Sequence, residues 1–200
     1  MNFFIPNKLS VKQKIELLEI FTGFETSNRY EINEAGGRKF LFAFEKSGLI
    51  WKFLLTDRRP LEIHMVDDAK REVFLLKRGF FWFFPSYELF HGSELVGKIK
   101  KRFAFFHTKY SIKDSSNEEI AKLEGPMWRP WTFNIKAPNG KKIGLLGKKF
   151  SGFKEFFTDS DNFSFQVDDN IQDNALKALI LASTFAVDYD NFDIKPTNSN

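Results

Sequence analysis

The sequence predicts a mainly β protein, in which a closed antiparallel barrel surrounds a hydrophobic helix. Three observations lead to this fold class: a short alternating segment recurs along the chain, polar turns follow five of its six copies, and one long apolar segment lies near the C-terminus. The chain has 200 residues, and 42% of them are hydrophobic, which is enough to form the core of a single domain.

The alternating segment predicts a series of β-hairpins. Its six copies begin at Tyr30, Leu61, Tyr87, Tyr110, Phe133 and Phe163. The first five are each followed by a polar turn and then by a second alternating strand, which is typical of a hairpin. Five hairpins and a sixth leading strand favour a closed barrel, because closure removes the exposed sheet edges. The alternative is a two-sheet sandwich with the helix packed outside it.

The longest apolar segment, residues 175–187, predicts the central helix, which we place near residues 174–187. Asp173 and Asn174 are candidates for its N-cap, and Lys177 is its only charged residue. A helix that is apolar on all sides belongs inside other structure. At about 1.5 Å per residue it is too short to cross the roughly 30 Å of a bilayer core, so no transmembrane span is expected.

The N-terminal part predicts a short amphipathic helix over residues 11–21. Val11, Ile15 and Leu18 recur at helical spacing, with Ser10 as N-cap and Gly23 just beyond the end. We therefore expect an N-terminal segment (residues 1–28) whose helix packs on the outside of the barrel, a barrel domain (29–193) and a disordered tail (194–200). No signal-peptide pattern is visible at the N-terminus, so a cytoplasmic location is expected.

Composition excludes several functional classes. The chain has no Cys, so disulfides, thiolate metal sites, Cys nucleophiles and S-acylation are excluded. No Ser/His/Asp arrangement, paired-carboxylate motif or Gly-rich phosphate loop is visible, and we expect no enzymatic bond chemistry. The net charge of +4 suits an anionic surface. Nucleic-acid binding is suggested only by this charge and the basic run at residues 98–102, and we do not expect it.

Four stretches resemble the phospholipid scramblase family. They are QKIELLEIFTGFETSNRYEI at residues 13–32, RPLEI at 59–63, REV at 71–73 and FTDSDNF at 157–163, which the apolar helix follows. The similarity extends in order from about residue 9 to residue 190. The resemblance implies a tubby-like fold, with a barrel of about twelve strands around the C-terminal helix. It also implies Ca2+-dependent, ATP-independent movement of phospholipids between membrane leaflets. The alternative is a soluble tubby-like module that binds a lipid headgroup or a protein and moves no lipid.

One departure from the family concerns membrane anchoring. Eukaryotic members carry Cys clusters that become palmitoylated, whereas the corresponding positions here lie in residues 48–55, 79–85 and 127–131, which contain all four Trp. The resemblance therefore identifies this chain as a compact, Cys-free homologue, for which we expect no anchoring by S-acylation.

The aromatic segments are expected to gather at one end of the barrel, because connections between hairpins alternate with the hairpin turns. Aromatic rings next to basic side chains are typical of an interface with anionic headgroups. The candidate membrane-contact residues are Trp51, Phe80, Phe81, Trp82, Phe83, Phe84, Trp128, Trp131, Lys148 and Lys149. Alternatively, the rings pack on the ends of the helix, although five successive aromatic residues at 80–84 cannot all face inward. We expect peripheral association with anionic phospholipid membranes, and the sequence indicates no particular protein partner.

The resemblance also implies a Ca2+ site. The EF-hand-like segment of the family corresponds to residues 159–170, and its first, third and last ligand positions are Asp159, Asp161 and Asn170. The segment has no Gly at its sixth position, and Asn170 offers a neutral carbonyl where a bidentate carboxylate is expected. Asp168 or Asp169 could take its place. We therefore expect a Ca2+ site of weak affinity. Alternatively, Asp159 and Asp161 are turn residues before the last strand.

Overall fold

The computed structural model describes residues 3–13, 28–46, 58–129, 131–148 and 163–191. These residues form twelve strands and the helix α2 (Asn174–Asn191). The strands are β1 (Lys8–Gln13), β2 (Arg29–Glu34), β3 (Lys39–Lys46), β4 (Leu61–Val66), β5 (Glu72–Arg78), β6 (Ser86–His91), β7 (Glu94–Arg102), β8 (His107–Asp114), β9 (Glu119–Pro126), β10 (Thr132–Lys136), β11 (Lys142–Lys148) and β12 (Phe163–Val167).

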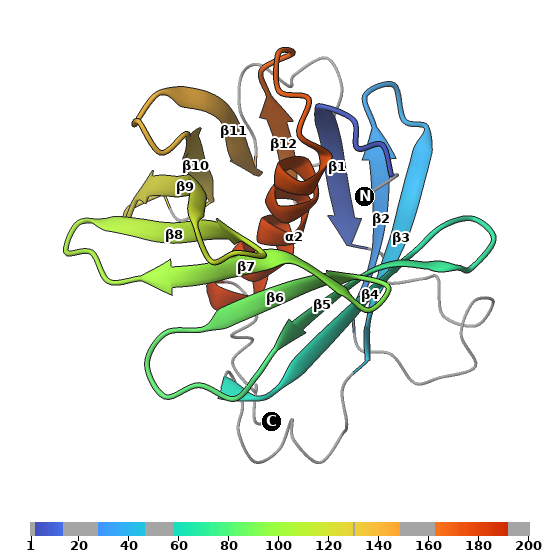
Figure 1. Cartoon of the computed structure of the whole chain (residues 1–200), viewed down its shortest axis with the longest axis horizontal. Coiled ribbons are helices and arrows are strands. Elements are labelled where there is room, and N and C mark those ends of the chain that lie inside the picture. Colours follow the sequence, from blue (N-terminus) through green and yellow to red (C-terminus); the bar gives the residue numbers. More distant parts are fainter. Residues whose placement is uncertain (1–2, 14–27, 47–57, 130, 149–162, 192–200) are drawn as a thin grey trace, which may run out of the picture.

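The strands form one closed barrel around α2 (Figure 1). The strand order follows the chain from β2 to β12, and β1 closes the ring by pairing antiparallel with both β12 and β2. The five predicted hairpins are β2–β3, β4–β5, β6–β7, β8–β9 and β10–β11, and β12 is the sixth leading strand. The predicted closed barrel is therefore confirmed, and the two-sheet sandwich is excluded.

β1 corrects the prediction of an N-terminal helix. Residues 11–13 form the end of this strand, and residues 14–21 lie outside the described residues, so the helix is not seen. A closed sheet with only antiparallel neighbours needs an even number of strands, whereas five hairpins and β12 give an odd number. β1 supplies the missing strand, and its Leu9 (0% exposed) and Val11 (4%) face the core. The segment 1–28, expected outside the barrel, thus contributes one of its strands.

Four hairpins share one turn geometry, which explains the repeat in the sequence. In each turn a backbone N–H donates to the carbonyl three residues earlier, and the donors are Gly37, Lys70, Asn117 and Gly140. All four donors have positive φ, from 61° at Lys70 to 83° at the two glycines. The pairing of each of these hairpins also shifts register just before the turn. A turn with one left-handed residue and a bulge keeps the twist of the two strands compatible.

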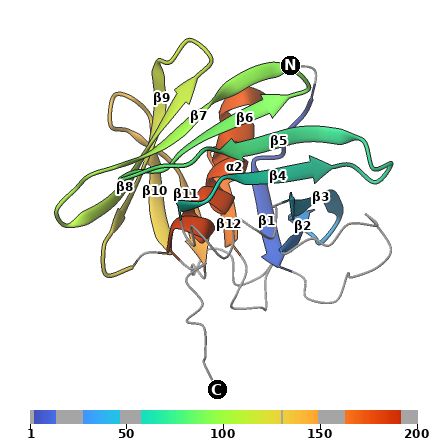
Figure 2. The same ribbon diagram turned by 90° about the horizontal axis from the view of Figure 1, so that it is seen from below.

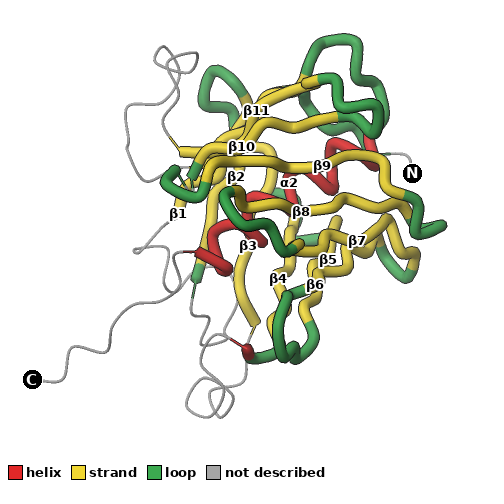
Figure 3. Tube along the Cα trace, turned by 90° about the vertical axis from the view of Figure 1, so that its left-hand side faces the viewer, coloured by secondary structure: helices red, strands yellow, loops and turns green. Residues whose placement is uncertain are grey.

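α2 runs through the middle of the barrel (Figure 2), and the tube drawing shows strands around it (Figure 3). Leu179, Ile180, Ser183 and Val187 are all 0% exposed, as the prediction of a central helix requires. The helix continues to Asn191, beyond the expected end at residue 187. No helix in the described part of the chain has the length and hydrophobicity of a membrane span.

The start of α2 is capped as the sequence predicts. Asp173 Oδ1 accepts hydrogen bonds from the N–H groups of Ala175 and Leu176 at 2.8 and 3.1 Å, which makes Asp173 the N-cap. Lys177, the one charge expected in the helix, is buried, and its Nζ donates to Asn7 Oδ1 at 3.1 Å. The charge of Lys177 is therefore accommodated at the end of the barrel, next to the N-terminal residues.

Gly97 allows β7 to approach β8 and the helix closely. A Cβ atom at this position would lie 2.2 Å from the Lys113 carbonyl oxygen and 2.9 Å from Leu179 Cδ1. Neither distance is compatible with a side chain, and the carbonyl belongs to the neighbouring strand, so it cannot move aside easily. Only glycine fits here.

Truncation of Leu179 tests the enclosed helix. Leu179 has no exposed surface, and removal of a large buried aliphatic side chain leaves a cavity that the surroundings fill only in part. We expect Leu179→Ala to lower the free energy of unfolding by about 2–5 kcal/mol in a urea titration. A loss below about 0.5 kcal/mol, the range of surface substitutions, would instead indicate a loosely docked helix.

Gly97→Ala tests the close approach of β7. The added methyl group overpacks the contact with β8 and Leu179, and we expect the free energy of unfolding to fall by about 1–3 kcal/mol. Gly79→Ala is the matched control, because a Cβ atom at Gly79 meets nothing within 4 Å. Equal stability of the two variants in urea titration would contradict the proposed role of Gly97.

Candidate membrane-binding site

The two ends of the barrel are closed differently. At the end with the hairpin turns, the N-terminal residues cover the opening: Ile5 is fully buried, and the Phe3 ring packs against Phe40 and Phe74 at centroid distances of 5.7 and 5.5 Å. The connections between hairpins lie at the opposite end, where α2 terminates. The exposed aromatic residues gather there.

Ten exposed hydrophobic side chains lie on three connections at this end. We call them the aromatic rim, and they are Phe80, Trp82, Phe83, Phe84, Phe103, Phe105, Phe106, Met127, Trp128 and Trp131. Among the described residues, Phe4 is the only other exposed large hydrophobic side chain. Exposure in the rim ranges from 40% at Trp131 to 87% at Phe83, so these side chains do not pack on the ends of the helix. An apolar concentration of this kind marks an interaction surface.

The three connections of the aromatic rim are neighbours in space. They join β5 to β6, β7 to β8 and β9 to β10, and these strands are consecutive around the barrel. The ring centroids of Phe84 and Phe103 are 6.3 Å apart, and the Met127 N–H donates to the Phe106 carbonyl at 3.2 Å. The aromatic rim is therefore continuous from the first connection to the third.

The structure places most of the candidate membrane-contact residues in this rim. Phe81 is the exception in its segment: it is half-buried, and the Arg78 guanidinium lies 5.2 Å from its ring centroid. Lys148 points inward, and its Nζ lies 3.7 Å from Asp188 Oδ1. Trp51 and Lys149 lie outside the described residues. Lipid contact of all these residues stays a prediction.

Beneath the aromatic rim, the inward-facing positions of the strands change from apolar to polar. Phe74 and Leu76 of β5 face the core, and Arg78 takes the next inward position. The same change occurs in β3, β7 and β11. We call the resulting layer the polar collar, and it consists of Glu45, Arg78, Tyr87, Lys101, Tyr110 and Lys148 around Asp188, Tyr189 and Asp190 of α2.

Asp190 is the centre of one half of the polar collar. The Tyr87 and Tyr110 hydroxyls donate to its carboxylate at 2.6 and 3.0 Å. Arg78 Nη1 and Lys101 Nζ lie 3.5 and 4.0 Å from the same group. A buried carboxylate is tolerated only when it is paired and hydrogen-bonded, and Asp190 meets both conditions.

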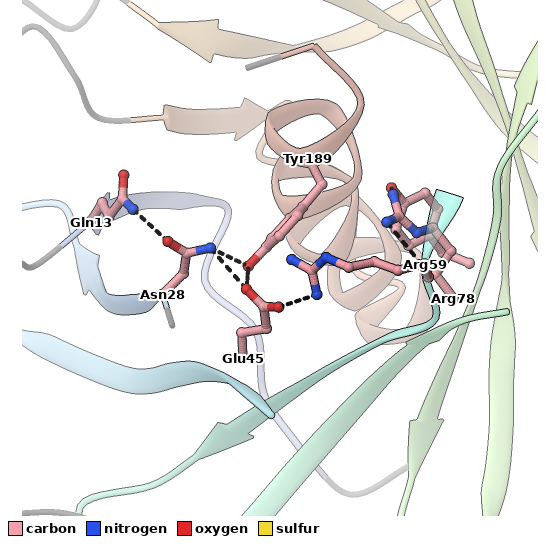
Figure 4. A network of polar contacts seen from close by, with 7 residues as sticks. Gln13, Asn28, Glu45, Arg59, Arg78 and Tyr189 are labelled. Atoms are coloured by element: carbon pink, nitrogen blue, oxygen red, sulfur yellow. Dashed lines mark hydrogen bonds and ion pairs between the residues drawn. The ribbon is translucent and has the colours of Figure 1, made fainter. Parts of the chain in front are cut away.

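Glu45 is the centre of the other half (Figure 4). It forms a buried ion pair with Arg59 and accepts hydrogen bonds from Asn28 Nδ2 and from the Tyr189 hydroxyl, both at 2.8 Å. Gln13 extends this network by donating to Asn28 Oδ1 at 3.0 Å. The last turn of α2 is thus bonded to several strands of the barrel.

Burial shifts the pKa values of the charged groups in the collar. It raises the pKa of Asp190 above its ordinary value, against the opposing effects of Lys101, Tyr87 and Tyr110. Burial also raises the pKa of Asp188 and lowers the pKa of Lys101. In each case the loss of water outweighs the partner charge. The collar therefore holds the end of α2 by compensated charges in a poorly hydrated layer.

The chain is similar to known proteins over nearly its whole length. A family model described as Scramblase matches residues 3–194. The chain belongs to the scramblase family. It is 29% identical to mouse phospholipid scramblase 1 over 198 residues, which cover 92% of this chain and 60% of the mouse protein. It is also 29% identical to human phospholipid scramblase family member 5 over 194 residues, or 90% of this chain and 71% of the human protein. No solved structure gives a significant match.

A more distant relative in the scramblase family comes from fission yeast. A phospholipid scramblase family protein of Schizosaccharomyces pombe is 26% identical over 171 residues, which cover 78% of this chain and 44% of the yeast protein. This chain thus spans about 60% of the length of the mouse relative, or less than half of the yeast one.

The sequence did not predict the polar collar of this scramblase-family chain. Lys148 was a candidate for membrane contact, whereas the structure turns both Lys148 and Arg78 into the barrel. Strand alternation could have predicted part of the collar. Leu41, Ala43 and Glu45 share one face of β3, so the pattern indicates that the charged Glu45 side chain faces the interior. The acidic residues that directly follow the apolar segment were a second signal.

The candidate Ca2+ ligands are only partly described. Asp159 and Asp161 lie outside the described residues, and Asn170 lies in an exposed turn after β12. Four steps along β12, from Phe163 to Val167, cover about 13 Å of extended chain. Ligands of one Ca2+ ion lie about 2.4 Å from it, so the strand argues against a single loop that holds all three oxygens. No group of three His, Asp or Glu arranged for a metal ion occurs in the part of the chain that the structure describes.

The raised pKa of Asp188 predicts a pH dependence of stability. The folded chain binds this proton more tightly than the unfolded chain does. At a pH below 3.8, the ordinary pKa of the carboxyl group, Asp188 therefore makes its full contribution to the free energy of unfolding. This contribution is lost as the pH rises through the higher pKa that Asp188 has in the folded chain. We expect the stability of the wild type relative to Asp188→Asn to fall as the pH rises above about 4, measured by urea titration at a series of pH values. An increase in this relative stability with pH would mean that the ion pair between Asp188 and Lys148 outweighs the cost of burying the charged carboxylate.

Proposed function

We propose that this protein binds the surface of anionic phospholipid membranes through the aromatic rim and moves phospholipids between the leaflets without ATP. The observation that carries the proposal is the concentration of ten exposed hydrophobic side chains on three neighbouring connections. Trp side chains are enriched at the depth of lipid headgroups, where an apolar ring and a polar N–H are both satisfied, and the rim contains three of them, Trp82, Trp128 and Trp131. The names of the relatives support phospholipid as the substrate class.

Binding at the aromatic rim would combine two contributions. Burial of apolar surface contributes about 25 cal/mol per Å², and each basic residue near an anionic surface adds about 1 kcal/mol. Arg102 and Arg129 are exposed beside the rim and can supply the second contribution. Arg78 and Lys148 are engaged with Asp190 and Asp188 and are expected to add little. Stable membrane association generally needs two such signals together.

The filled barrel bears on the route of the lipid. Side chains of α2 occupy the interior with no exposed surface, so we place lipid movement at the outer surface of the rim rather than through the barrel. Rings inserted among the headgroups of one leaflet would disturb lipid packing there and ease the passage of a headgroup. The filled interior also favours a second candidate function, a tubby-like module that binds lipid and moves none.

The proposal includes a role for Ca2+ at Asp159 and Asp161, which precede β12. Carboxylate oxygens are the ligands that Ca2+ prefers, and two aspartates alone give weak affinity unless other oxygens complete the shell. Bound Ca2+ would neutralise these carboxylates and reduce their repulsion from anionic lipid. Ca2+ is therefore expected to strengthen membrane binding rather than to catalyse a step.

Substitution in the aromatic rim tests membrane binding. Wild-type protein should bind reversibly to phosphatidylcholine vesicles that contain phosphatidylserine, and salt should weaken the binding because part of it is electrostatic. Joint replacement of Trp82, Phe83 and Trp128 by Ser should reduce binding at least about tenfold in co-sedimentation, because apolar burial is lost. Phe4→Ser is the matched control, since Phe4 is about as exposed as Trp82 and Trp128 but lies at the opposite end of the barrel. If the folded triple variant binds like the wild type, the rim does not contact lipid.

Reconstitution into vesicles tests transport. If the protein moves lipid, it should accelerate the loss of fluorescence of a labelled phospholipid when dithionite reduces the label in the outer leaflet. Addition of Ca2+ should increase the rate, and Asp159→Ala should remove that increase while the circular dichroism spectrum stays unchanged. Co-sedimentation without accelerated loss would exclude transport and leave the lipid-binding module.

A further inference from the structure

A hollow of about 270 Å³ lies on the outer face of the barrel, beside the aromatic rim. It is formed by β7, β8 and β9, and Phe103 of the rim lies at its edge. Three cations and two carboxylates line it: Arg102, Lys109, Lys122, Glu119 and Glu124. A volume of this size is below that of most pockets for drug-sized ligands, and it suits a small polar group.

The charges in the hollow leave an excess of positive charge. Lys109 and Lys122 lie 3.2 and 2.9 Å from Glu124 and Glu119, respectively. Lys136 of β10 also binds Glu124, at 2.6 Å. Within the described part of the chain, no carboxylate lies at salt-bridge distance from Arg102, which is exposed. The carboxylates thus orient the lysines. Arg102 helps to lower the pKa of Glu119 through its charge but forms no salt bridge with it, so its guanidinium N–H groups are left to bind an external anion.

Strand register places these cations directly beside the rim. Arg102 pairs with Lys109 across β7 and β8, and Lys109 pairs with Glu124 across β8 and β9. Between β7 and β8 this pair is the last one before the connection, because Phe103 follows Arg102 in the chain, and the β8–β9 ladder continues for two more pairs, to His107 and Pro126. Below the row, the Ser111 hydroxyl is buried and donates to Glu119 at 2.5 Å, so the floor of the hollow is an ordered polar surface.

We propose that this hollow binds the phosphate group of a phospholipid headgroup, while the aromatic rim contacts the apolar part of the same lipid. The proposal rests on the proposed function and names the headgroup subsite for it. A guanidinium offers two parallel N–H donors that match two phosphate oxygens, and Lys109 adds a second charge from the neighbouring strand. An amphiphilic ligand would find its anionic and apolar binding partners in adjacent residues, Arg102 and Phe103.

A soluble headgroup tests the hollow without any membrane. Glycerophosphoserine, titrated into the full chain, should give saturable amide shifts in β7, β8 and β9 by NMR. The double variant Arg102→Gln/Lys109→Gln should abolish these shifts, and Glu124 keeps Lys136 as a partner in this variant, so the fold is preserved. Lys113→Gln is the matched control. Its charge lies on the same strand as Lys109 but about 13 Å farther along it. Absence of saturable shifts in the wild type, or equal shifts in the double variant, would overturn the proposal.

Vesicles decide whether the bound phosphate belongs to a lipid. Loss of two basic contacts should weaken binding to phosphatidylserine-containing vesicles about thirtyfold, if each contributes as basic residues near membranes generally do. Lys113→Gln should change it less than about twofold, because the residue lies more than a Debye length from the rim at physiological salt. If inorganic phosphate and glycerophosphoserine bind the hollow but vesicle binding is unchanged in the double variant, the lipid assignment is wrong. If wild-type protein binds no vesicles at all, the proposed function fails, and the titration still decides whether the hollow binds phosphate.

Discussion

A helix without a polar face is stable in water only when other structure encloses it, and the architecture of this protein follows from that constraint. α2 needs apolar neighbours on every side, whereas an open sheet can cover only one. A sheet closed on itself supplies them all, and when all neighbours are antiparallel the number of strands must be even. β1 meets this condition, and Gly97 brings β7 close enough to Leu179 to leave no gap.

Enclosure also determines what the two ends of the barrel must do. At the start of α2, the N-terminal residues cover the core and Asn7 accepts a hydrogen bond from Lys177. At its end, the helix carries Asp188 and Asp190 where the macrodipole is already negative, an unfavourable combination. Inward-facing cations of the strands compensate it, above all Arg78 and Lys101. The polar collar is therefore the consequence of ending an acidic helix inside a barrel.

The elements of this fold could be predicted where the sequence fits one periodicity, and they could not where it fits two. The hairpins were predictable because four of them repeat the same turn, with Lys70 and Asn117 in the conformation that glycine takes elsewhere. β1 was not, because Val11 fits both an alternating and a helical spacing, and only the requirement for an even number of strands distinguishes them. Strand alternation predicted only that residues 80–84 cannot all face inward, and the structure exposes four of them on a connection rather than on a strand. The direction of Arg78 was not predictable, because a charge at a strand end is ordinarily on the surface.

The aromatic rim and the polar collar are parts of the same chain segments, because the strands that carry collar residues lead directly into the connections that carry the rim. Arg78 is the last residue of β5, and Lys101 is the last but one of β7. The connections that follow these strands carry Phe80 to Phe84 and Phe103 to Phe106. The bases of these connections are therefore held by charges that pair with α2, while their tips remain exposed to bind. Since α2 fills the interior, a lipid bound as we propose would lie outside the barrel, where the apolar rim borders the cationic hollow. Two surfaces of opposite chemistry in contact with each other match the two parts of an amphiphile better than either matches a purely apolar or purely ionic ligand.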